Sequence, residues 1–179
     1  MRITAGRLRG RKVTVPDIPG VRPTPSKVRQ ALFNILGPLD GCQVLELFSG
    51  SGLMALEALS RGAASVTSIE KDRRIVGRLS DMRSGFGVEL EWYLLCGDAQ
   101  AELGRLKGRH FDLIFADPPY GKGISEALPQ WLDAAGVSCG QLVIEEEARA
   151  EPAWPAGWTE RQARRYGGTC LHFLDKERA

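Results

Sequence analysis

From residue 42 onward, short apolar runs alternate with helix-length amphipathic segments, and glycine or aspartate stands at most junctions. This alternation is typical of βαβ units. It predicts strands at residues 43–48, 65–70, 90–95, 111–116 and 141–145, and helices at residues 53–61, 72–84, 99–106 and 125–135. Strands that are joined by helices run parallel, so the pattern predicts an α/β domain whose parallel sheet is covered on both faces.

The C-terminal segment follows a different pattern, in which a turn rather than a helix separates two strand-length runs. The two runs are residues 159–165 and 169–174, and Tyr166, Gly167 and Gly168 lie between them. Strands joined by so short a connection pair antiparallel. The whole chain therefore predicts a seven-stranded, mostly parallel sheet with an antiparallel hairpin at its C-terminal edge.

The first forty residues are rich in glycine and proline, and a helical pattern follows at residues 27–36. Ile3 and residues 13–15 are typical of short strands, and the basic segment between Gly6 and Lys12 would join them as a hairpin. We therefore expect an N-terminal extension, a basic hairpin followed by a helix, over residues 1–40. The α/β domain is expected over residues 41–179.

Composition and cysteine spacing favour one globular domain without a metal. The chain is 43% hydrophobic and 26% charged, and its four cysteines form no C-x-x-C pair. Cys96 and Cys170 lie in apolar runs, so we expect both to be core residues with free thiols, which suits the reducing cytoplasm. The lack of an apolar signal segment and of any apolar stretch near the ~20 residues of a membrane-spanning helix also predicts a cytoplasmic location.

Positive charge is concentrated at the N-terminus, although the net charge is only +2. The basic residues of positions 1–29 are Arg2, Arg7, Arg9, Arg11, Lys12, Arg22, Lys27 and Arg29, against the single acid Asp17. Such a segment attracts phosphate groups without reading a base sequence, so it predicts a nucleic-acid partner. The alternative is a solvated basic tail.

A glycine-rich turn follows the first expected strand of the domain. It contains Glu46, Phe48, Ser49, Gly50 and Gly52, at the end of a strand where open α/β sheets bind ligands. The dinucleotide fingerprint G-x-G-x-x-G is absent, which disfavours a diphosphate cofactor. S-adenosylmethionine has no phosphate, and we expect Glu46 to lie near its amine. A turn that only lets a helix pack closely is the alternative.

Two further acids end the next two expected strands. Glu70 stands about as far from the turn as the acid that accepts ribose hydroxyls in dinucleotide folds, and Asp98 is a candidate partner of the adenine amine. With their neighbours Lys71 and Ala99, they complete the predicted cofactor-binding set. The alternative for Glu70 is an exposed acid in a charged run.

The most specific motif is Asp117-Pro118-Pro119-Tyr120, directly after the apolar run 111–116. Each proline fixes φ at about −65° and has no N–H, so the segment presents its carbonyl oxygens rigidly. Asp117 and the Pro118 carbonyl are suited to accept the two hydrogens of an exocyclic base amine. The ring of Tyr120 can stack on a base removed from its helix. The motif predicts methyl transfer to a base nitrogen, and the alternative is a proline turn that ends a core strand.

The glycine turn and the D-P-P-Y motif resemble those of class I methyltransferases, which have a Rossmann-like fold. More narrowly, the chain resembles the bacterial 16S ribosomal RNA guanine-N2 methyltransferases. The segments that carry this resemblance are residues 1–3, 5–6, 22–24, 28–34, 57–63 and 166–169.

The resemblance implies S-adenosylmethionine as cofactor, catalysis by residues 117–120, and methylation of one guanine amine in 16S ribosomal RNA. The RNA would belong to the small subunit or an assembly intermediate, and a monomeric enzyme is expected. The residues expected on the RNA side are Arg7, Arg9, Arg11, Lys12, Arg22, Thr24, Lys27 and Arg29.

Three other functions stay open. DNA adenine methyltransferases use a similar motif but usually carry an additional target-recognition region, for which this chain has little room. A non-catalytic RNA-binding protein with this fold would have no use for Asp117 or Gly50. A methyltransferase of small molecules or protein amides would not need the basic N-terminus.

Overall fold

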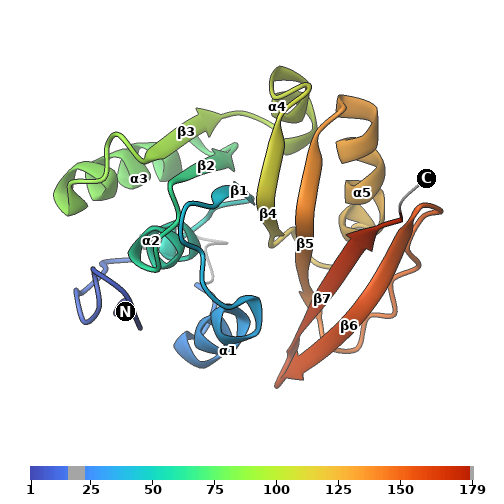
Figure 1. Cartoon of the computed structure of the whole chain (residues 1–179), viewed down its shortest axis with the longest axis horizontal. Coiled ribbons are helices and arrows are strands. Elements are labelled where there is room, and N and C mark those ends of the chain that lie inside the picture. Colours follow the sequence, from blue (N-terminus) through green and yellow to red (C-terminus); the bar gives the residue numbers. More distant parts are fainter. Residues whose placement is uncertain (16–22, 178–179) are drawn as a thin grey trace.

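The computed structural model describes residues 1–15 and 23–177, and a seven-stranded sheet forms its centre. The strands are β1 (Gln43–Leu47), β2 (Ser65–Glu70), β3 (Trp92–Cys96), β4 (His110–Ala116), β5 (Ser138–Glu147), β6 (Trp158–Tyr166) and β7 (Thr169–Lys176). The helices are α1 (Ser26–Leu36), α2 (Leu53–Ser60), α3 (Arg73–Phe86), α4 (Ala99–Arg105) and α5 (Ile124–Ala135). Helices α2 and α3 pack on one face of the sheet, and α4 and α5 pack on the other (Figure 1).

The strand order is β3-β2-β1-β4-β5-β7-β6. The first five strands of this order pair parallel, and β7 pairs antiparallel with both β5 and β6. The predicted α/β fold, with its mostly parallel sheet and antiparallel edge hairpin, is confirmed. Strand β5 is longer than the predicted 141–145 because its first residues pair with β4 and its last residues pair with β7.

Side-chain alternation along the strands divides the interior into two cores. Val44 and Leu113 belong to the core that includes residues of α1, α2 and α3, whereas Leu45 and Ile114 belong to the core beneath α4 and α5. Because successive strand residues point to opposite faces, the position of a residue in this alternation tells which core it faces.

The described part of the N-terminal extension packs against α2. Ile3, Leu8 and Val13 are buried in the same core as α2. The predicted hairpin is present as a short antiparallel pairing: Arg2 bridges Lys12, the Ile3 N–H donates to the Arg11 carbonyl at 3.1 Å, and the Val13 N–H donates to the Met1 carbonyl at 2.8 Å. The connecting segment is also held to α2, since the Arg7 N–H donates to the Ser60 carbonyl at 2.8 Å. The predicted helix is confirmed as α1.

One cysteine does not lie where the sequence predicts. Cys170 is buried, but Cys96 is exposed because it ends β3, the edge strand of the sheet. Over residues 1–15 and 23–177, no helix is long and apolar enough to cross a membrane. Nor do these residues contain a group of three or more His, Cys, Asp or Glu side chains arranged to hold a metal ion.

Candidate active site

Acidic side chains gather at the carboxyl ends of the central strands. Glu46 lies in β1 two residues after Val44, so it faces the α1–α3 side of the sheet. Asp117 directly follows β4, and the pairing of Ala116 with Ile144 brings it beside Glu145 of β5. The edge where open α/β sheets bind ligands is therefore lined by carboxylates.

Glu46 is 2% exposed and forms a hydrogen-bonded chain with two neighbours. The Ser68 hydroxyl donates to its Oε2 at 2.5 Å, and the Trp92 indole N–H donates to that hydroxyl at 2.8 Å. Burial raises the pKa of Glu46 to about 7, although the hydrogen bonds oppose the shift. A buried acid in this state is suited to a cationic group, which would stabilise its ionised form.

The glycine turn is strained and tied to the next strand. Phe48 has φ 61°, and it is the one non-glycine residue with positive φ in the described ranges. Such outliers cluster at functional sites. The Gly50 N–H donates to Glu70 Oε2 at 3.1 Å, and the Ser49 N–H donates to the Ile69 carbonyl at 3.2 Å. Glu70, predicted to hold the ribose, thus also fixes the turn.

Packing accounts for the second glycine of the turn. Gly52 has φ 68°, and a Cβ there would lie 2.5 Å from Leu79 Cδ2 and 2.8 Å from the Trp92 ring. A side chain at this position is therefore excluded by the core and by the left-handed backbone. The close-packing alternative explains Gly52 without any cofactor.

The remaining predicted cofactor residues lie around the ends of β2 and β3. Lys71 is exposed and Ala99 is buried. Asp98 is exposed and caps α4, since its Oδ1 accepts hydrogen bonds from the N–H groups of Gln100 and Ala101 at 3.0 and 3.2 Å. An N-cap role explains this aspartate without a ligand.

The D-P-P-Y segment is anchored to β1. The Asp117 N–H donates to the Leu47 carbonyl at 3.4 Å. Burial raises the pKa of the Asp117 carboxyl well above its usual range, and Glu145, Glu146 and Glu46 reinforce the shift. Tyr120 is 39% exposed, and burial of its hydroxyl raises its pKa to about 12, so the phenol stays neutral. Pro118 is buried and Pro119 is exposed.

Glu145 is a site residue that the sequence motifs do not single out. Its Oε2 accepts a hydrogen bond from the Thr24 hydroxyl at 3.1 Å, and the hydroxyls of Tyr120 and Thr169 lie against the same carboxylate. Burial raises its pKa despite these hydrogen bonds. The one sequence signal is a run of three acids, residues 145–147, directly after an apolar strand.

Two residues predicted on the RNA side are internal. Arg29 is 0% exposed, and its Nε lies 3.1 Å from Glu57 Oε2. It also donates to the Thr24 carbonyl at 3.2 Å. An arginine whose donors are used inside the fold cannot meet a phosphate, so the predicted RNA contact of Arg29 is wrong. Thr24 is buried too, and its hydroxyl serves Glu145.

The other basic residues predicted on the RNA side differ in whether their side chains are bound within the fold. Arg7 pairs with Glu91 at 2.5 Å, and Arg11 donates to the Gly85 carbonyl at 2.9 Å. The predicted cations that are exposed and have no ion pair in the described ranges are Arg9, Arg11, Lys12 and Lys27. Arg22 lies outside the described residues.

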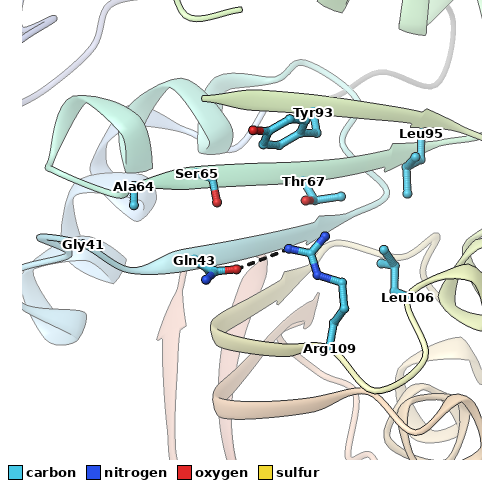
Figure 2. A pocket seen from close by; sticks show the side chains of 9 residues that line it. All are labelled: Gly41, Gln43, Ala64, Ser65, Thr67, Tyr93, Leu95, Leu106 and Arg109. Carbon is cyan, nitrogen blue, oxygen red and sulfur yellow. Dashed lines mark hydrogen bonds between the residues drawn. The ribbon is translucent and has the colours of Figure 1, made fainter. Parts of the chain in front are cut away.

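A pocket of about 510 Å³ opens at the opposite edge of the sheet. Figure 2 shows Gln43 and Arg109 facing each other across it, joined by a hydrogen bond of 3.3 Å. Gln43 and Ser65 begin β1 and β2, so this pocket lies at the amino ends of the strands. None of the acids described above lines it.

The strand order with an antiparallel β7, the glycine turn after β1 and the D-P-P-Y segment after β4 define a class I methyltransferase. Comparison with known proteins agrees. The model of the family described as Conserved hypothetical protein 95 matches residues 1–175, and the chain belongs to this family.

Named relatives and a solved structure cover almost the whole chain. Ribosomal RNA small subunit methyltransferase D from Escherichia coli K12 is 35% identical over 185 residues, which cover 99% of this chain and 90% of that protein. The protein of the same name from Haemophilus influenzae is 34% identical, with coverages of 89% and 85%. The solved structure of yhhF from Escherichia coli has a TM-score of 0.87 and 34% identity, covering 99% of this chain and 98% of that one.

Proposed function

We propose that this chain transfers a methyl group from S-adenosylmethionine to the exocyclic N2 amine of a guanine in 16S ribosomal RNA of the small subunit. The observation that carries the proposal is the rigid D-P-P-Y segment, which sets Asp117 among buried acids at the carboxyl edge of the sheet. The substrate class is supported by the name of the Escherichia coli relative, a ribosomal RNA small subunit methyltransferase, at 35% identity.

The residues near the glycine turn fit this cofactor. S-adenosylmethionine carries two positive groups, an amine and a sulfonium, and Glu46 is a buried acid that has no ion pair among the described residues. When bound, the cofactor supplies an electrophilic methyl group. The residues that would hold it are Glu46, Phe48, Ser49, Gly50, Gly52, Glu70, Lys71, Asp98 and Ala99.

The catalytic segment prepares the amine as a nucleophile. The lone pair of an exocyclic amine is delocalised into the base, and acceptors for both of its hydrogens favour a tetrahedral nitrogen. The Asp117 carboxylate and the Pro118 carbonyl supply these acceptors. Methylation releases a proton from the nitrogen, and the raised pKa of Asp117 suits it to receive that proton. The placement of these two hydrogen-bond acceptors then supplies much of the rate enhancement.

The acidic lining favours guanine over other bases. The Watson–Crick edge of guanine presents two adjacent donors, N1–H and the N2 amine. In adenine and cytosine the ring nitrogen beside the amine is an acceptor, which a carboxylate repels. Asp117 and Glu145 lie side by side at the carboxyl edge of the sheet. The exposed ring of Tyr120 offers a stacking surface for the base.

The test is methyl transfer from labelled S-adenosylmethionine to small ribosomal subunits from a strain that lacks the modification. Nuclease digestion and mass spectrometry then identify the methylated nucleoside, and Asp117→Ala serves as the control. N2-methylguanosine at one site with the wild type, and none with the variant, is the expected result. Cofactor binding without transfer to subunits or 16S RNA, or transfer to DNA adenine instead, would overturn the proposal.

A further inference from the structure

Arg164 of β6 lies in the same cross-strand row as the acids of the site. It pairs with Leu171 of β7, and Leu171 pairs with Glu145 of β5. Paired residues of neighbouring strands point to the same face, so Arg164 and Glu145 lie on one face of the sheet. Two strand spacings of about 4.8 Å separate their backbones by about 10 Å.

The guanidinium of Arg164 is free to bind a ligand. The residue is exposed, and its one hydrogen bond among the described residues is to the carbonyl of the adjacent Ala163, at 3.5 Å. None of the ion pairs in that part of the chain involves it. Arg161 of the same strand differs, since it lies 3.8 Å from Asp175.

The end of the hairpin is joined to the catalytic segment. Thr169 begins β7, pairs with Glu147 of β5 and lies against Tyr120. The Ala148 N–H donates to the Gly168 carbonyl at 2.9 Å, which ties the turn to the end of β5. Figure 1 shows the β6–β7 turn reaching past the end of β5. A nucleotide that enters the site beside Tyr120 therefore passes near this turn.

Arg165 offers an internal comparison. It is also exposed and has no ion pair in the described ranges. It pairs with Cys170, which pairs with Glu146, so it belongs to the next row and points to the opposite face. Two adjacent arginines thus carry the same charge on opposite faces of the sheet.

We propose, resting on the proposed function, that Arg164 binds a backbone phosphate of the RNA strand whose base enters the active site. Arg164 is a free cation on the site's own face, whereas Arg29 and Arg7 of the N-terminal segment form ion pairs within the fold. A guanidinium suits phosphate because its planar donors match the phosphate oxygens. The contact would position the strand without reading its sequence.

The experiment compares Arg164→Ala with Arg165→Ala and with the rescue variant Arg164→Lys. Methyl transfer to unmodified small subunits gives kcat and KM. Binding to transcribed 16S RNA is measured at salt concentrations from about 0.05 to about 0.3 M. Loss of one phosphate contact is expected to raise KM about five-fold and to lower the salt slope by about 0.7–0.9. Arg164→Lys should keep most of the slope, and kcat should change little.

Equal effects of Arg164→Ala and Arg165→Ala, or no effect of either, would overturn the role of Arg164. A defect in methyl transfer to subunits with unchanged binding to 16S RNA would mean that Arg164 contacts a ribosomal protein. That result would also overturn the proposed phosphate contact. Failure of the proposed function is distinct, because the wild type itself would then transfer no methyl group. RNA binding of the two variants would still decide the role of Arg164 in that case.

Discussion

The Thr24 hydroxyl donates a hydrogen bond of 3.1 Å to the Glu145 carboxylate, although the two residues lie 121 positions apart. The bond joins the segment before α1 to the acidic edge of the sheet, and the Tyr120 hydroxyl lies against the same carboxylate. The N-terminal segment and the catalytic loop are therefore held by one side chain.

Removing this bond should reduce catalysis without unfolding the site. We expect Thr24→Val to lower kcat/KM on small subunits about 5- to 20-fold, since a hydrogen bond to a buried carboxylate is lost. Cofactor affinity should stay the same, because Glu46 and Glu70 are unaffected. Steady-state kinetics and calorimetric titration measure the two quantities. Thr24→Ser keeps the hydroxyl and serves as control, and equal kinetics of the two variants would contradict the prediction.

Asp117 should affect the chemical step more than binding. Asp117→Asn keeps the size of the side chain but removes the charge and the proton acceptor, so we expect kcat to fall about 10²- to 10³-fold. Binding of S-adenosylmethionine should change little. Single-turnover methyl transfer, with cofactor binding measured in parallel, tests this expectation. A variant with wild-type kcat would show that the acid has no part in activating the amine.

Stability should depend on pH through Glu46. Burial raises its pKa to about 7 in the folded protein from an ordinary value of 4.5, so the folded state holds the proton more tightly than the unfolded state. This contribution is complete below about pH 4.5 and is lost as the pH rises through about 7. The free energy of unfolding of the cofactor-free protein should therefore fall by up to about 3 kcal/mol across this range from Glu46 alone.

Glu46→Gln isolates this group from the other acids of the site. Urea unfolding of the wild type and the variant between about pH 5 and pH 8 should give a smaller pH dependence for the variant. Parallel curves would show that Glu46 titrates near its ordinary pKa. Because Glu46→Gln leaves Asp117 in place, any pH dependence that remains belongs to the other carboxylates.

The fold could be predicted from the sequence because its signals are local. Apolar runs, glycine turns and helix-length segments each occupy a few neighbouring residues, and their alternation specifies a parallel sheet. Asp117 and Glu46 were recognisable for the same reason, since each lies within a short motif. The N-terminal hairpin is local as well, but its docking on α2 depends on contacts far away in sequence, such as the bond from the Arg7 N–H to the Ser60 carbonyl.

The residues that the motifs miss or misplace depend on partners that lie far away in the sequence. Arg29 looks like a member of the basic N-terminal run, and its partner Glu57 lies 28 residues further along. Glu145 looks like an exposed acid in a run of three, yet it is buried, pairs with Leu171 of β7 and accepts a hydrogen bond from Thr24, 121 residues away. Spacing along the chain gives no sign of either contact.

The Arg29–Glu57 pair should be structural rather than RNA-binding. Both side chains are 0% exposed, and Glu57 also accepts hydrogen bonds from the Thr4 N–H and from Arg61. Removing one partner leaves a buried charge, so Arg29→Ala should lower the free energy of unfolding by about 3–5 kcal/mol. Arg29→Met with Glu57→Leu removes both charges and should lose less free energy of unfolding than the two single changes together.

Denaturant unfolding measures the stability of all of these variants, and RNA binding should be compared at a temperature where each is folded. If Arg29→Ala kept its stability and weakened RNA binding, Arg29 would return to the RNA-binding surface despite its burial.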